Sequence, residues 1–200
     1  MPRLNVVRKL SFASAILMLA PSTNAIAHAE AGLHADFFHG LAHPFAGLDH
    51  VLVMLGVGLL AWIMGKARWQ LPLAFVLIMA GGACAASFLS LFPWVESAIA
   101  ASVIGVGILI MRGKTLSFAL ALPLIAIFAL THGYSHGAEM PILGSGLAYG
   151  AGFVLATASL HAMGLLVGAG LTQLGAIEVS RATGLGMAVL GFALLLGTLP

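Results

Sequence analysis

Six apolar stretches, each long enough to cross a lipid bilayer, constrain the fold of this sequence more than any other feature. An α-helix rises 1.5 Å per residue, so about 20 residues span a hydrocarbon core of about 30 Å. Long continuous apolar runs indicate helices, which satisfy their own backbone polar groups inside lipid. The predicted spans are residues 44–64, 70–91, 95–111, 116–137, 142–171 and 183–199. The predicted fold class is therefore an all-α integral membrane protein, a bundle of about six transmembrane helices.

The composition agrees with a membrane protein and argues against other partners. Hydrophobic residues make up 61% of the 200 residues, charged residues make up 7%, and the mean hydropathy is +1.11. The formal charge is only +2 and the basic residues are dispersed, which argues against nucleic acid as a partner. Cys84 is the single cysteine, so it has no partner for an internal disulfide, and we expect it to be a small buried residue. The lipid bilayer is the expected surrounding, and a homo-oligomer is left open.

The amino terminus has the pattern of a secretory signal peptide. Arg3, Arg8 and Lys9 precede an apolar core at residues 10–20, and Ala25-Ile26-Ala27 fits an A-x-A cleavage pattern. The alternative, an uncleaved anchor, requires a longer apolar core. We therefore predict a signal peptide at residues 1–27 and one membrane domain at residues 28–200, with His28 as the first mature residue.

The basic residues of the mature chain predict its orientation. They lie in alternate loops between the predicted spans, and short cytoplasmic loops of membrane proteins are enriched in Lys and Arg. These residues are Lys66, Arg68, Arg112, Lys114 and Arg181. The prediction is a multi-pass protein of the bacterial inner membrane with a periplasmic amino terminus.

Histidines and carboxylates gather around the beginning of the first span. The group comprises His34, Asp36, His39, His43, Asp49 and His50. On one continuous helix Asp36, His39, His43 and His50 would form a single wall. Pro44 and Gly47 indicate instead that the helix is broken or begins there, as in transporters that expose an ion site at membrane depth. Asp49 points away from that wall, so it either binds a metal itself or holds a neighbouring imidazole ring.

A second group lies at the end of the fourth span. His132, His136 and Glu139 share one helix face through their i, i+4 and i+3 spacing. Imidazole and carboxylate without thiolate suit Ni²⁺, Co²⁺ and Zn²⁺ better than Cu⁺, Mg²⁺ or Ca²⁺. We predict that His43, Asp49, His50, His132, His136 and Glu139 bind a divalent metal ion. His28, His34, Asp36, His39 and His161 are additional candidates.

His161 lies deep in the fifth span, near a GxxxG step formed by Gly164 and Gly168. Small residues at this spacing let helices approach closely, so His161 is expected to face protein and not lipid. Either a structural hydrogen bond or a place on the ion path explains a histidine at that depth.

Two motifs resemble those of the HupE/UreJ family of hydrogenase- and urease-associated membrane proteins. Residues 43–50 read HPFAGLDH and match the pattern HPxxGxDH, and residues 132–139 read HGYSHGAE and match HGxxHGxE. Thr131 and Ser135 replace the Phe and Ala usual beside the two histidines of the second motif. The resemblance implies a permease for Ni²⁺, with Co²⁺ left open, that serves hydrogenase or urease maturation.

The expected activity is therefore secondary transport, not catalysis. The metal is expected as the transported substrate, and no prosthetic group is expected. Other readings are an integral-membrane metalloenzyme with a metal on His50, His132 and His136, a b-type haem protein, and a metal-binding accessory or sensor protein without transport.

Cleavage after Ala27 is the first testable prediction. Amino-terminal sequencing of protein purified from membranes is expected to begin at His28, because the apolar core of residues 10–20 is too short to remain as an anchor. Retention of Met1 would contradict the signal peptide.

Overall fold

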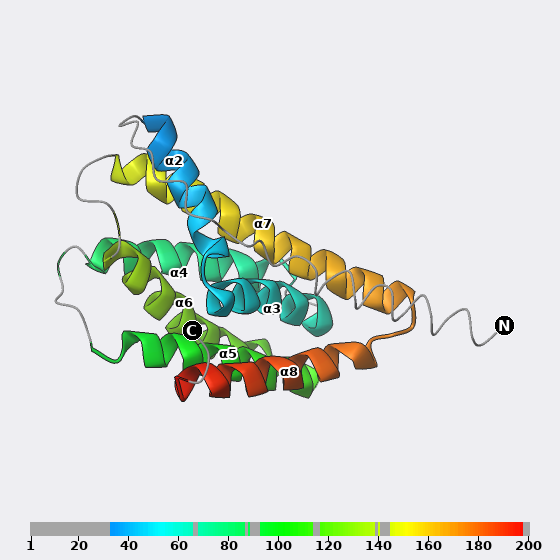
Figure 1. The fold of residues 1–200 in the computed structure, drawn as a ribbon. Coiled ribbons are helices and arrows are strands. Elements are labelled where there is room, and N and C mark those ends of the chain that lie inside the picture. Colours follow the sequence, from blue (N-terminus) through cyan, green and yellow to red (C-terminus); the bar gives the residue numbers. More distant parts are fainter. Residues whose placement is uncertain are drawn as a thin grey trace.

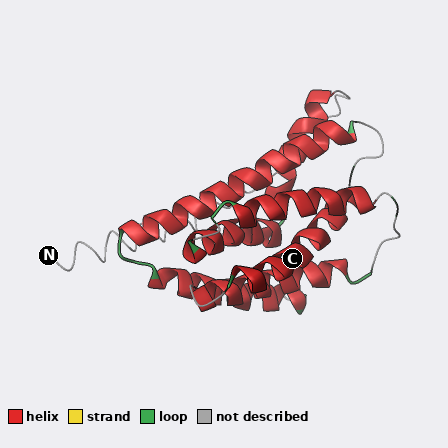
Figure 2. Cartoon of the chain, turned by 180° about the vertical axis from the view of Figure 1, so that it is seen from behind, coloured by secondary structure: helices red, strands yellow, loops and turns green. Residues whose placement is uncertain are grey.

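The described part of the chain is built of helices and contains no strand. The computed structural model describes residues 33–65, 68–86, 88, 93–113, 117–138, 140 and 145–197. Its elements are α2 (Leu33–Ala42), the 3-10 helix η1 (His43–Phe45), α3 (Leu48–Met64), α4 (Gln70–Ala86), α5 (Val95–Arg112), α6 (Phe118–Ala138), α7 (Gly146–Gln173) and α8 (Glu178–Leu195). The all-helical fold class is confirmed (Figure 2).

Several of these helices have the length and hydropathy of membrane spans. Four helices, α5 to α8, meet both conditions, and the bent pair of residues 36–45 and 48–64 gives a fifth span if it is counted as one. Helix α4 is apolar but shorter, with 17 residues. The chain is therefore a multi-pass membrane protein, while a count of six spans stays a prediction. The signal peptide at residues 1–27 lies outside the described residues.

Consecutive helices from α3 to α8 run in alternating directions and pack in pairs (Figure 1). Helix α4 packs against α6, α5 against α8, and α7 against both α2 and α3. We call the end where α6 ends and α7 begins the histidine end. The opposite end, which carries Arg68, Arg112 and Arg181, is the arginine end.

The chain bends sharply between α2 and α3. Pro44 lies in η1, and Gly47, with extended backbone angles (φ −107°, ψ 127°), precedes the first residue of α3. The segments at residues 36–45 and 48–64 meet at 80°. The break indicated by Pro44 and Gly47 is therefore present, because proline and the extended Gly47 interrupt helical hydrogen bonding. The wall of Asp36, His39, His43 and His50, which required one continuous helix, does not form.

Glycines bring the paired helices into backbone contact. A Cβ on Gly133 of α6 would overlap the carbonyl oxygen of Met79 in α4, and a Cβ on Gly82 would lie 2.5 Å from the carbonyl oxygen of Leu130. Helices α3 and α7 meet in the same way, since Gly58 and Gly164 each abut backbone atoms of the other helix. Such contacts replace the hydrophobic driving force that is absent between helices in lipid.

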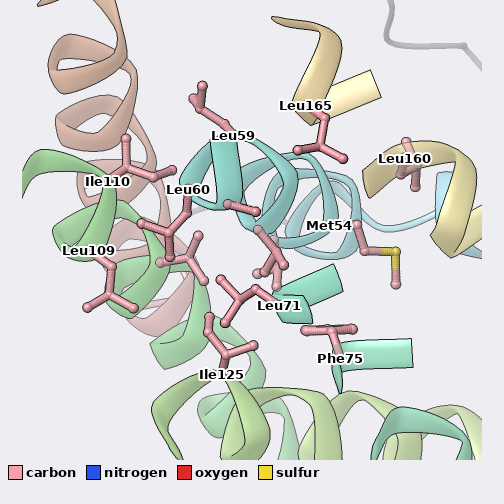
Figure 3. Close-up of a cluster of buried hydrophobic side chains, with 14 of the residues drawn as sticks. Met54, Leu59, Leu60, Leu71, Phe75, Leu109, Ile110, Ile125, Leu160 and Leu165 are labelled. Carbon is pink, nitrogen blue, oxygen red and sulfur yellow. The ribbon is translucent and has the colours of Figure 1, made fainter. Parts of the chain in front are cut away.

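Apolar side chains fill the centre of the bundle around α3 and also cover its outside. Figure 3 shows Met54 and Leu60 of α3 near Leu71 and Phe75 of α4, and all four are fully buried. Many leucines on the outer faces are exposed, as expected of surfaces that contact lipid chains. Cys84 is also exposed. The expectation that Cys84 is buried is wrong, because its position on α4 turns outward whereas Gly82 faces α6.

The glycine contacts predict a matched difference between two substitutions. Gly133→Ala is expected to lower the free energy of unfolding by about 1–3 kcal/mol, because the added methyl group forces α6 away from Met79. Gly150→Ala is the control, since nothing lies within 4 Å of the position its Cβ would take. Thermal unfolding in detergent measures both variants, and equal stability of the two would contradict the close-contact interpretation.

Candidate metal centre

Two histidines of α6 point into the bundle beside the glycines that contact α4. His132 and His136 are 0% and 3% exposed, and each is followed by a glycine whose Cβ would overlap backbone atoms of α4. Adjacent positions on a helix are about 100° apart, so the glycines face α4 while the imidazole rings turn toward α3 and α7. The HG repeat of the sequence thus encodes both the close contact and the direction of the rings.

The break before α3 brings two more histidines to these rings. The ring of His50 lies 5.0 Å from that of His132 and 4.3 Å from that of His136, measured between centroids. The ring of His43 lies 4.8 Å from that of His136. His43, His50, His132 and His136 therefore form one cluster at the histidine end, which we call the four-histidine cluster.

The hydrogen bond of His132 fixes which of its nitrogens is free to bind an ion. Nδ1 of His132 lies 2.8 Å from the carbonyl oxygen of Phe128, one turn earlier on α6. A carbonyl only accepts, so Nδ1 carries the proton and Nε2 of the neutral ring keeps its lone pair. Nε2 is buried and has no hydrogen-bond partner among the described residues. A buried imidazole nitrogen with an available lone pair is suited to bind a metal ion.

Asp49 performs the same task for His50. One carboxylate oxygen of Asp49, Oδ1, lies 2.6 Å from Nδ1 of His50 and accepts the backbone N–H of His50 at 2.8 Å. Nε2 of His50 is buried and also lacks a partner within the described part of the chain. A carboxylate that holds one ring nitrogen while the other faces the metal is a common arrangement in metal sites. Of the two roles left open for Asp49 by the sequence, this geometry corresponds to holding a neighbouring ring.

Gly47 provides the space for this pair. A Cβ on Gly47 would lie 2.6 Å from both Oδ1 of Asp49 and Nδ1 of His50. Because this distance is too short for any side-chain carbon, only glycine at position 47 lets the carboxylate fold back onto the ring. This lack of space explains the glycine in the HPxxGxDH pattern.

Aromatic residues of α7 cover the cluster, and the sequence analysis did not identify them. The ring of Phe153 lies 4.3 Å from that of His136 and 6.0 Å from that of His43, and Tyr149 lies 5.8 Å from His43. Tyr149 and Phe153 are separated by one helical turn, on the face where Gly152 contacts α2. The i, i+4 spacing of Tyr149 and Phe153 beside Gly152 is the sequence pattern that could have indicated them.

Three of the other candidate ligands, Asp36, His39 and His161, lie outside the four-histidine cluster. Asp36 accepts a hydrogen bond of 2.6 Å from the backbone N–H of Ser145, which caps the amino terminus of α7. His39 is exposed on α2. His161 is buried and faces protein, as expected, and its ring lies 5.0 Å from that of Phe75. His28, Glu139 and the side chain of His34 lie outside the described residues.

The rings of the cluster pack against one another by their faces and edges. Among the described residues, no three His, Cys, Asp or Glu side chains have donor atoms arranged as a metal site. Three nitrogens of the cluster can converge only if rings rotate about their side-chain torsions. The predicted ligand set therefore stays a prediction, although four of its six residues form the cluster and Asp49 holds one of the rings.

The family is decided by comparison with known proteins. The family model described as HupE / UreJ protein matches residues 16–194. The chain belongs to the HupE/UreJ family. Within this family it is similar to Protein HupE of Rhizobium leguminosarum bv. viciae, with 42% identity over 175 residues that cover 86% of this chain and 91% of that protein. No solved structure matches the chain. The resemblance of the two HupE/UreJ motifs is thus confirmed, and the described residues of both motifs supply the four-histidine cluster.

The contact between Asp49 and His50 predicts the metal affinity of two variants. Asp49→Asn removes the carboxylate charge and Gly47→Ala displaces the carboxylate, so both are expected to weaken Ni²⁺ binding about 10- to 100-fold. Isothermal titration of the purified protein measures the affinity. His39→Ala, on an exposed position of α2, is the control and is expected to bind Ni²⁺ as the wild type does. Wild-type affinity in Asp49→Asn would show that Asp49 does not support a metal-binding ring.

Proposed function

We propose that this HupE/UreJ family member is a secondary transporter that carries Ni²⁺, with Co²⁺ as an alternative substrate, from the periplasm to the cytoplasm for hydrogenase or urease maturation. The observation that carries the proposal is the four-histidine cluster, in which Nε2 of His50 and Nε2 of His132 are buried with no hydrogen-bond partner among the described residues. Buried polar atoms without partners are costly, so a function that uses their lone pairs accounts for them. Imidazole ligands with a carboxylate and without thiolate favour a borderline divalent metal such as nickel.

The distribution of charge supports the direction of transport. Arg68, Arg112 and Arg181 all lie at the arginine end, and the positive-inside rule assigns that end to the cytoplasm. The histidine end would then face the periplasm and receive the incoming ion. The family membership supports a role in supplying nickel to hydrogenase or urease.

The membrane potential supplies the driving force for such a transporter. Moving a dication inward across 100 mV, negative inside, releases about 4.6 kcal/mol, which is twice the value for one charge. This free energy corresponds to roughly a thousandfold accumulation at about 1.4 kcal/mol per tenfold. Neither a phosphate-binding loop nor a prosthetic group is needed, and the 200-residue sequence contains no such loop.

Metal uptake into proteoliposomes tests the proposal. With an imposed inward-negative potential, wild-type protein is expected to accumulate radioactive nickel. His43→Ala, Asp49→Ala, His50→Ala, His136→Ala and Glu139→Ala are each expected to reduce uptake to background, whereas His34→Ala only weakens it, because water can replace a ligand outside the bundle at little cost.

Three comparisons complete this experiment. His39→Ala is the control for removal of an imidazole on the same segment, since His39 is exposed and lies outside the cluster. Competition by cobalt, zinc and copper measures selectivity. Wild-type vesicles that take up no metal would overturn the permease and favour an enzyme or a sensor, whereas uptake that survives both His50→Ala and His136→Ala would remove the cluster from the path.

A further inference from the structure

His161 is a buried histidine that the four-histidine cluster does not include. Its side chain is 1% exposed, and neither ring nitrogen has a hydrogen-bond partner among the described residues. It lies 15 residues into α7, about 22 Å along the helix axis from the histidine end. A structural histidine would have a hydrogen bond at this depth, because an unpaired polar group in an apolar interior is costly. His161 therefore requires another explanation.

Phe75 is the aromatic ring that His161 and the cluster share. Its centroid lies 5.0 Å from the ring of His161, nearly perpendicular to it, and 5.9 Å from the ring of His132. His132 is the deeper of the two cluster histidines on α6, six residues from the end of that helix. Phe75 is itself completely buried. Phe75 therefore contacts both His132 of the cluster and His161.

Apart from the two imidazole rings, Phe75 belongs to a core of buried apolar side chains. Met54 of α3, Met79 of α4 and Leu160 of α7 are buried in the same core as Phe75, and Figure 3 shows Met54 near Phe75. A polar group nearby, the hydroxyl of Thr157, is directed at the sulfur of Met79 at 3.9 Å. These apolar side chains separate the imidazole groups of the cluster from that of His161. A divalent ion enters an apolar region only at a high cost in free energy.

Space continues from His161 toward the arginine end. His161 lines a groove of about 290 Å³ between α4 and α7, together with Trp69 and Leu165. Both of these residues also line a second groove of about 320 Å³, which reaches Arg68.

We propose that Phe75 is the barrier that separates the four-histidine cluster from His161, and that His161 receives an ion that has passed Phe75. The identity of the ion and the direction of its passage rest on the proposed function, whereas the barrier itself does not. Met54 and Met79 beside Phe75 have flexible, unbranched side chains that can yield when the ring of Phe75 rotates. The ring then opens the contact between the two sites without a movement of the backbone.

Side-specific thiol labelling tests the barrier without reference to metal transport. In a Cys84→Ala background, His161→Cys places a thiol on the far side of Phe75, and a charged, membrane-impermeant methanethiosulfonate is added from the histidine end. Labelling is expected to be slow with Phe75 in place, at least tenfold faster with Phe75→Ala, and intermediate with Phe75→Leu, which is the milder variant if Phe75→Ala does not fold.

Phe153→Ala is the matched control, because it removes the same ring from beside His136 and His43 and not from between His132 and His161. It is expected to leave the labelling rate unchanged, and labelling after denaturation confirms that every variant carries a reactive thiol. Two results would overturn the barrier: fast labelling while Phe75 is present, or equal rates with Phe75, Leu and Ala at position 75 in folded protein.

Nickel uptake by Phe75→Trp connects the barrier to the proposed function. The larger ring is expected to lower uptake at least tenfold, and the Ni²⁺ affinity measured in detergent separates an effect on passage from an effect on the neighbouring ring of His132. If wild-type vesicles take up no nickel but the labelling rates differ as expected, the permease fails and the barrier stands. If uptake occurs but the labelling rate does not depend on the residue at position 75, the barrier proposal is overturned and the transport proposal is retained.

Discussion

Backbone contact between helices at glycine is the constraint on which the rest of this structure depends. Gly133 of α6 lies directly against the backbone of α4, and Gly58 and Gly164 join α3 to α7 in the same way. In lipid the hydrophobic effect does not draw helices together, so close packing of small residues must do so. These contacts also set the rotation of each helix, and that rotation directs His132 into the bundle and not into lipid.

The sharp bend before α3 converts a local sequence motif into a site shared by several helices. Because Pro44 and Gly47 end one helix and allow the next to begin at 80°, His43 and His50 both reach the rings of α6. A straight helix would have spread its histidines along about 10 Å of one face, at 1.5 Å per residue. The same bend lets Asp49 fold back on His50, in the space that Gly47 leaves open.

Apolar side chains cover the outside of this protein as well as most of its centre, and a few imidazole rings are buried among them. Leucines cover the outside, while the imidazole rings of the cluster and of His161 lie inside, separated by Phe75. The proposed barrier at Phe75 keeps the four-histidine cluster and His161 apart as two separate polar positions. An ion-carrying protein needs such a division, because an open path would dissipate the membrane potential that drives uptake.

The helical class, the approximate helix positions, the family and the candidate histidines could all be read from the residues alone. Hydropathy, the HPxxGxDH and HGxxHGxE patterns and glycine spacing act over a few neighbouring residues. Packing in three dimensions shows that Asp36 binds the backbone N–H of Ser145 while Asp49 holds His50, that His39 is exposed, and that Phe75 contacts both His132 and His161. These outcomes depend on an 80° bend and on the rotation of α4 and α7 about their axes, which packing between helices distant in sequence sets. No local pattern of residues carries that information.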